Sequence, residues 1–195
     1  MFRNIAVVVV GLLVGAVPPT FLHLLHADEP AVADAGVVAP PTTIRLNGEI
    51  EGDFTELLAQ LNLAKDDVTL VITSEGGSVV SGMRLILAIE DIRAKNKLRV
   101  HCIADMFALS MAAAILESGA CDDRAMTDRT LILFHGVQAP PSPISEALNN
   151  SMAAWISHRL GITPEAYRAH IAKGDWILSP PAALEAHVVD RVLSP

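Results

Sequence analysis

The stretch that decides the fold class is "VTLVITSEGGSVVSGMRLILAIEDIRAK", residues 68–95. Residues 68–74 form a run of β-branched and aliphatic side chains, which is typical of a strand buried in a parallel sheet. A glycine pair ends the run, and residues 83–95 then repeat apolar side chains at helical spacing. A strand that leads into such a helix predicts a βαβ unit with a right-handed crossover.

The same alternation continues on both sides of this unit. It predicts further strands at 43–50, 98–105, 128–134 and 188–193, and helices at 54–64, 110–119, 144–160, 164–172 and 179–187. The sequence therefore predicts an α/β domain with a mainly parallel sheet over residues 43–195. In sheets of this kind, binding and catalytic sites form where the strands reach their carboxyl ends.

The N-terminal residues 1–27 have the layout of a secretory signal. One cation, Arg3, precedes the uncharged apolar run Ile5–Val17, and the segment ends in the small residue Ala27. We therefore expect export to the periplasm or the exterior. Two fates stay open: cleavage after Ala27, or retention of the segment as a membrane anchor. Residues 28–42 are rich in Ala, Pro and Val without a period, which predicts a linker.

Charge and cysteine usage narrow the classes of partner. The net charge is −8, with 22 acidic against 14 basic residues, so we expect no nucleic-acid partner. No sequence motif indicates a cofactor, and the spacing of Cys102 and Cys121 fits no metal site.

A strand that starts at Leu98 would offset the two cysteines by about 13 Å along the sheet, beyond the reach of a disulfide. We therefore expect free thiols, with that of Cys121 exposed.

Three chemically suggestive features fall on the predicted strand ends. They are the pair Gly76-Gly77, Ser110 and His135. A lone serine in the apolar stretch 106–115 could simply bond a carbonyl of its own helix. With a histidine at the neighbouring strand end, the serine is instead a candidate nucleophile whose proton the imidazole removes.

Such a pair also needs an orienting carboxylate and an oxyanion hole. Asp175 is the preferred carboxylate, since Trp176 and Ile177 follow it and would bury it, and Asp190 is its competitor. The backbone N–H groups of Gly77 and Met111 are the candidate oxyanion donors. Glycine lets a backbone approach a ligand closely, and the first amide of a helix has no intrahelical partner.

Four segments together resemble a known family. They are "SEGGSVVSGM", "LSMAAAILESG", "LILFH" and "DWILSPPAALEAHVVDRVL", and in this order they are similar to the motif blocks of the Clp protease proteolytic subunit, within the crotonase-like fold class. The resemblance covers about residues 44–136 and 162–193. It implies a spiral of repeated strand–helix units and a serine peptidase with the triad Ser110, His135 and Asp175. It also implies oxyanion donors at Gly77 and Met111, and a homo-oligomer that cleaves peptides or unfolded proteins.

The sequence departs from the pattern of that family in several places. Glu75 stands where the family has proline, and Ala112 stands where it usually has glycine. The glycine-rich strand after the histidine is replaced by "GVQAPPSPIS", and the stretch from His135 to Asp175, 175 − 135 = 40 residues, is shorter than usual. These changes predict a shortened helical handle. Together with export, they lead us to expect a peptidase that works without an ATPase partner.

Three alternative functions stay open on the sequence. One is a catalytically decayed interaction domain on the same fold. Another is a Ser–Lys enzyme like the signal-peptide peptidases, although none of the four lysines is expected at a strand end facing Ser110. The third is an acyl-CoA enzyme of the crotonase class, which would need acidic catalysts in place of the Ser–His pair.

Overall fold

The computed structural model describes residues 42–194. The predicted signal or anchor, residues 1–27, and the linker up to residue 41 lie outside this part of the chain. The elements in chain order are β1 (Thr42–Ile50), α1 (Thr55–Leu63), β2 (Val68–Gly77), α2 (Val79–Asn96), β3 (Val100–Leu109), α3 (Met111–Leu116), β4 (Asp123–Thr127), β5 (Leu131–Phe134), α4 (Pro143–Leu160), α5 (Pro164–Ile171), β6 (Trp176–Leu178), α6 (Pro180–Glu185) and β7 (Arg191–Leu193).

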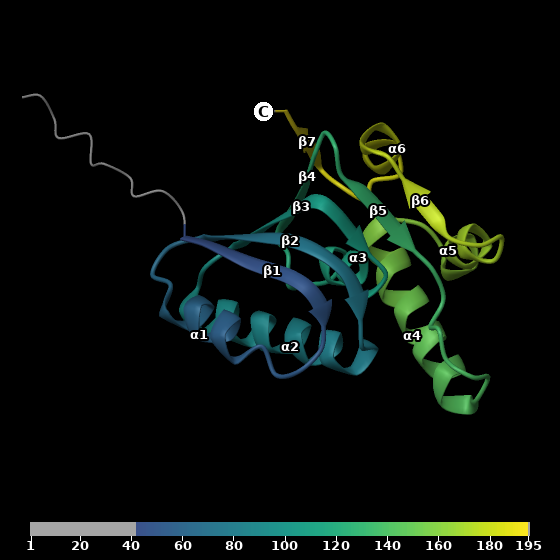
Figure 1. Cartoon of the computed structure of the whole chain (residues 1–195), viewed down its shortest axis with the longest axis horizontal. Helices are drawn as coiled ribbons and strands as arrows, with labels where there is room; N and C mark the ends of the chain where they lie inside the picture. The colour runs from purple at the N-terminus through teal and green to yellow at the C-terminus, as the bar shows by residue number, and fades with distance from the viewer. Residues whose placement is uncertain (1–41, 195) are drawn as a thin grey trace, which may run out of the picture. The chain divides into compact units, whose positions relative to one another are not determined.

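The strands form one mixed sheet that is mainly parallel (Figure 1). Its main path runs β1-β2-β3-β4-β7, and every pair along this path is parallel. β5 also pairs with β3 in parallel, and β6 pairs with β5 antiparallel. The predicted α/β class with a mainly parallel sheet is confirmed.

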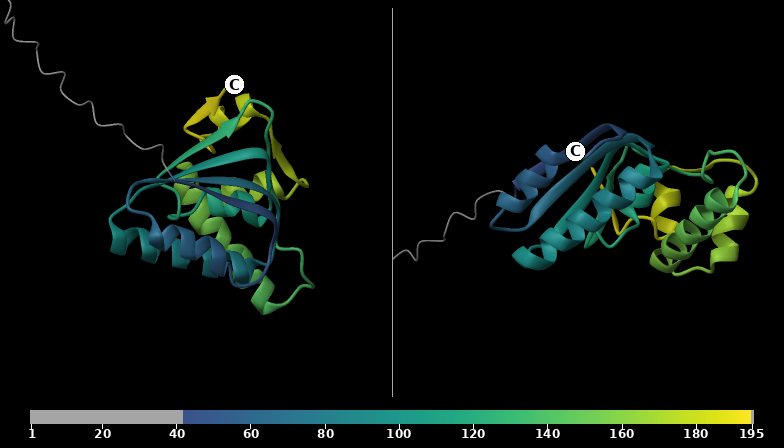
Figure 2. Two further views of the ribbon diagram at one scale, coloured as in Figure 1. Left: turned by 60° about the vertical axis from the view of Figure 1, so that its left-hand side comes forward. Right: turned by 90° about the horizontal axis from the view of Figure 1, so that it is seen from below.

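The helices cover the sheet and fix the strand ends. α1 and α2 run together along one side of the sheet, and α4 and α5 lie together at the end away from β1 (Figures 1 and 2). α3 is buried along its whole length, with every residue from Met111 to Leu116 at most 1% exposed. A short helix held in the core on all sides cannot shift easily, because interiors are close-packed. The residue that starts it, Ser110, is therefore held in place.

An irregularity in β3 decides which strand lies beside Ser110. Ile72 of β2 pairs with Ala104 and Ser74 pairs with Ala108, so a single residue of β2 is opposed by residues 105–107 of β3. Before this bulge β3 pairs with β4, and after it β3 pairs with β5. The strand predicted at 128–134 is therefore a turn followed by β5, and β4 is a separate strand. The bulge brings the end of β3 next to β5.

The expectation of two free thiols is wrong, because Cys102 and Cys121 form a disulfide with their Cα atoms 5.5 Å apart. β3 begins at Val100 rather than at residue 98, so Cys102 lies closer to the base of the sheet than expected. The turn after α3 also returns to this base, where the N–H of Asp122 donates to the carbonyl oxygen of Val100 at 2.8 Å. Both cysteines are buried, at 0% and 1% exposed.

Candidate active site

Ser110 sits at the junction of β3 and α3 in a strained backbone conformation. Its φ is 56° and its ψ −121°, a region that residues other than glycine rarely adopt. The Ser110 N–H donates to the carbonyl oxygen of Leu133 at 2.8 Å, and its own carbonyl accepts from the N–H of Ala114 at 3.1 Å. The side chain makes no helix-capping hydrogen bond. The backbone is thus fixed on both sides, while the hydroxyl is not used for capping.

Gly76 packs directly against this junction. Its φ is +95°, and a Cβ placed on it would lie 2.6 Å from the carbonyl oxygen of Leu109 and 2.7 Å from Cβ of Ser110. Only glycine fits there. The glycine pair in the sequence signals this position, but the prediction names Gly77 as the functional glycine and gives Gly76 no role of its own. A Cβ on Gly77 would instead meet the carbonyl oxygen of Ile50 in β1 at 2.7 Å.

His135 and Asp175 are placed by the ladder between β5 and β6. Phe134 pairs with Trp176 in this antiparallel ladder, and the register continued by one pair sets His135 opposite Asp175. Aromatic packing supports the ladder, with ring centroids of Phe134 and Trp176 5.5 Å apart and His170 stacked on Trp176 at 4.2 Å. Backbone pairing thus brings together two residues that lie far apart in the sequence.

The expected burial of Asp175 is wrong. Asp175 is exposed, Trp176 is half-buried and Ile177 is 58% exposed, because β6 is the outermost strand on this side of the sheet. No hydrogen bond joins the side chains of Ser110, His135 and Asp175 within residues 42–194. Catalytic hydrogen bonds are often long in a free enzyme and tighten when substrate binds.

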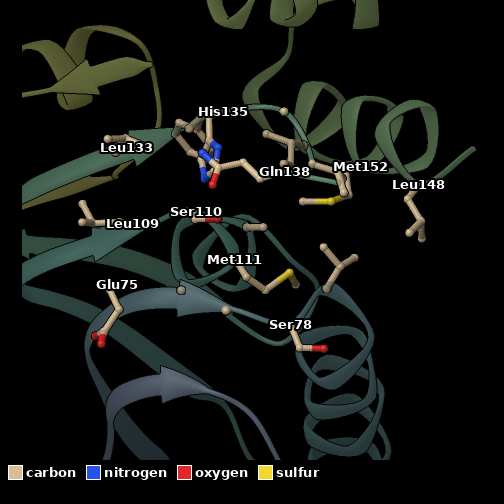
Figure 3. A pocket seen from close by; sticks show the side chains of 18 of the residues that line it. Glu75, Ser78, Leu109, Ser110, Met111, Leu133, His135, Gln138, Leu148 and Met152 are labelled. Atoms are coloured by element: carbon tan, nitrogen blue, oxygen red, sulfur yellow. The ribbon is translucent and has the colours of Figure 1, made fainter. Parts of the chain in front are cut away.

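All five residues selected from the sequence line one cleft of about 610 Å³, and Figure 3 shows Ser110, Met111 and His135 in it. They are Gly77, Ser110, Met111, His135 and Asp175. Met111 opens α3, so its N–H has no acceptor within the helix and can face a ligand. Apolar side chains form much of the remaining wall, namely Val79, Val80, Ala114, Leu148, Met152, Ile156 and Tyr167. The cleft thus combines a hydroxyl, an imidazole, a carboxylate and a free backbone donor.

The competing carboxylate, Asp190, is used elsewhere. It accepts hydrogen bonds from the guanidinium of Arg124 at 2.8 Å and from the Arg124 N–H at 2.7 Å. Burial alone would raise the pKa of Asp190, but the bonds from Arg124 outweigh it and lower this pKa. On its other side Arg124 pairs with Glu117, which is buried at the end of α3. Asp190 therefore belongs to a structural ion pair and does not line the cleft.

Residues 42–194 contain neither a candidate metal site nor a candidate membrane-spanning helix. No group of three or more His, Cys, Asp and Glu side chains there could hold a metal ion. No helix in the same range combines the length and the apolar character needed to cross a membrane.

Comparison with known proteins places the chain in a family. The family model of the Clp protease matches residues 35–195. An ATP-dependent Clp protease proteolytic subunit 1 from Nocardia farcinica is 28% identical over 139 residues, 66% of this chain and 68% of that protein. Its namesake from Corynebacterium glutamicum is 29% identical over 137 residues, 65% and 64% of the two chains.

The fold comparison agrees with the sequence comparison. A ClpP1 variant from Listeria monocytogenes superposes with a TM-score of 0.65 and 19% identity, over 78% of this chain and 91% of that one. The predicted resemblance is confirmed by these matches. The chain belongs to the Clp protease family, a family of serine peptidases.

Proposed function

We propose that this chain is a serine peptidase in which Ser110 is the nucleophile, His135 the general base and Asp175 the carboxylate that orients His135. One observation carries the proposal: the ends of β3 and β5 and the start of β6 meet in a single cleft, with strained Ser110 bonded through its backbone to β5. Strain of this kind persists where the surroundings enforce it, and it gathers at active sites.

In the first half of the reaction, Oγ of Ser110 attacks the carbonyl carbon of a bound peptide while the imidazole of His135 takes the hydroxyl proton. The N–H groups of Gly77 and Met111 donate to the oxygen on which negative charge develops. The C–N bond then breaks, and the imidazolium returns the proton to the leaving amine. An acyl group remains on Ser110.

In the second half, His135 takes a proton from a water molecule, whose oxygen attacks the acyl carbon. The bond to Oγ breaks, Ser110 recovers its proton from the imidazolium, and the carboxylic acid leaves. Asp175 holds the imidazole in the required tautomer throughout, from its position opposite His135 across the β5–β6 ladder.

The alternative Ser–Lys mechanism lacks support around the nucleophile. No lysine lines the cleft within the described residues, and Lys95 forms an ion pair with Asp91 on α2. The imidazole of His135 is therefore the base that the cleft offers to Ser110.

A fluorophosphonate probe tests the proposal, because it labels only an activated serine. We expect covalent labelling of Ser110, mapped by mass spectrometry, which is lost in Ser110→Ala and strongly slowed in His135→Gln. Ser151→Ala, which changes an exposed serine on α4, is the matched control and should label like the wild type. Absence of labelling in the wild type would instead favour a decayed interaction domain.

We further propose that the peptidase is exported and acts without an ATPase. The disulfide supports this, since such bonds persist in oxidising compartments, and residues 1–27 have the layout of a signal or anchor. Its substrates would be peptides or unfolded proteins, and it would assemble with copies of itself. Cell fractionation, and cleavage of a short peptide without ATP, test these two points.

A further inference from the structure

The cleft around Ser110 has an apolar wall on one side and an acidic residue on the other. Leu148 and Met152 lie on one side of Ser110, and Glu75 lies on the other (Figure 3). Apart from His135 and the phenol of Tyr167, the ionisable side chains that line the cleft are the carboxylates of Glu49, Glu75 and Asp175. No lysine or arginine of the described residues lines it. A bound peptide would therefore meet an apolar wall on one side of the nucleophile and negative charge on the other.

Glu75 is held close to the nucleophile by the backbone. It directly precedes Gly76, which packs against Ser110, and its own side chain is exposed. Glu49 of β1 pairs in register with Gly76, so two glutamates flank the same backbone position. Both glutamates thus line the same cleft as Ser110.

The two cleft glutamates differ from three aspartates at the opposite ends of the strands in their ionic partners. Within residues 42–194, Asp122, Asp123 and Asp190 each form an ion pair with an arginine, at the opposite ends of the strands. Glu49 and Glu75 form no ion pair within the same range. Their charge is therefore available to a cation supplied by a substrate.

We propose that Glu75, reinforced by Glu49, is a specificity-determining residue that favours peptides with a lysine, an arginine or a free ammonium group. The favoured cation lies on the side of the scissile bond away from the apolar wall. This rests on the proposed function, because attack by Ser110 defines where the bond lies. The proline that the family carries in place of Glu75 could not supply this charge. A cleft with low-dielectric walls concentrates the field of such charges.

The first experiment compares the cleavage of three internally quenched peptides that differ at one position, with Lys, Gln or Glu beyond the scissile bond. Mass spectrometry of the products locates the cut. We expect kcat/KM to be about fivefold higher for Lys than for Gln at low salt, and the ratio to shrink at about 0.5 M salt. Glu75→Gln should bring the ratio of kcat/KM for the Lys and Gln peptides close to one. Glu75→Lys should make the Gln peptide the better substrate. Glu185→Gln, an exposed glutamate on α6, is the matched control and should keep the wild-type ratio.

A second measurement separates this inference from the peptidase assignment. Fluorescence anisotropy reports the binding of the same peptides to Ser110→Ala protein, which needs no turnover. Tighter binding of the Lys peptide that is lost on adding Glu75→Gln supports the role of Glu75 even if no cleavage is found. An unchanged Lys-to-Glu ratio after Glu75→Gln, in either experiment, overturns it. Failure of the fluorophosphonate test alone would overturn the peptidase assignment only.

Discussion

The backbone N–H of Ser110 donates a 2.8 Å hydrogen bond to the carbonyl oxygen of Leu133, two residues before His135. The nucleophile and its base are thus joined by main chain, and this bond does not depend on the serine hydroxyl. Ser110→Ala should therefore lower the peptidase activity by several orders of magnitude. It should change the free energy of unfolding by less than about 1 kcal/mol. Turnover of a peptide ester and thermal melting, measured on the same preparation, check both points.

Gly76→Ala should disable the site through geometry alone. The added methyl would lie 2.6 Å from the carbonyl oxygen of Leu109 and 2.7 Å from Cβ of Ser110, so the junction must move. We expect activity to fall at least about tenfold, since small misplacements of a reacting group cost this much. Gly48→Ala is the control: it has φ +75° and nothing within 4 Å of the added methyl. Equal loss of activity in both variants would show that backbone strain alone, and not contact with Ser110, is responsible.

Two aspartate variants should separate catalysis from stability. Asp175→Asn should lower kcat about tenfold or more, because an amide favours the wrong imidazole tautomer, and should leave the melting temperature unchanged. Asp190→Asn should do the reverse. It weakens the pair with Arg124, at a cost of about 1 kcal/mol once solvent screening at a 43% exposed side chain is allowed for. Melting curves and initial rates of both variants decide the assignment, and the opposite pattern would make Asp190 the orienting residue.

Much of this site is predictable from the sequence, because the strand ends are marked by abrupt changes of composition. The β-branched run before Gly76 and the apolar run before His135 both stop where the chain becomes polar, so parallel strands bring these ends to one edge. Asp175 is different. Its position opposite His135 depends on an antiparallel register between two strands that α4 and α5 separate in the sequence. The apolar side chains that follow Asp175 predict its burial, and the structure instead leaves it exposed.

The errors have a common physical origin. The turn at residues 128–130 between β4 and β5 contains no glycine or proline, and a hydroxyl holds it, with Oγ1 of Thr130 donating to the carbonyl oxygen of Ala104 at 3.1 Å. Sequence periodicity does not report such a tertiary bond, so the strand predicted at 128–134 includes the turn residues 128–130 and misses β4. The disulfide is missed for the same reason, because it depends on where the turn after α3 meets β3.

Stability should depend on pH through Glu117. Burial raises the pKa of Glu117 from 4.5 to about 8, against the opposing attraction of Arg124. Between these values the folded protein keeps a proton that the unfolded chain releases. The contribution of Glu117 to stability is therefore complete below about pH 4.5 and is lost as the pH rises towards 8.

Glu117→Gln removes this titration. Relative to the wild type, the variant should gain stability as the pH rises from about 5 to about 8, because only the wild type must bind a proton when it folds in this range. Urea unfolding at pH 5 and pH 8 gives the free energy of unfolding of both proteins. Glu185→Gln is the control, and its free energy of unfolding should change with pH as that of the wild type does. A Glu117→Gln difference that is the same at both pH values contradicts the pH dependence.

The disulfide should contribute measurably to stability. It closes a loop with a sequence separation of 19 residues, for which chain-entropy arguments give about 3 kcal/mol. The double variant Cys102→Ala/Cys121→Ala should therefore melt about 6–12 °C lower than the oxidised wild type. Peptide mapping without reductant should recover the two cysteines in one linked pair. Two separately alkylated cysteines in folded, exported protein would rule the bond out.

That bond also changes what a single cut in the chain would do. Ser110, Met111 and the whole of α3 lie inside the covalent ring between Cys102 and Cys121. The exposed residues inside the ring are Met106 and Gly119, the places that a neighbouring protease could reach. Hydrolysis at either position would open the chain without dividing it, because the disulfide still joins the two pieces. A nicked molecule would keep both halves of its active site attached to each other.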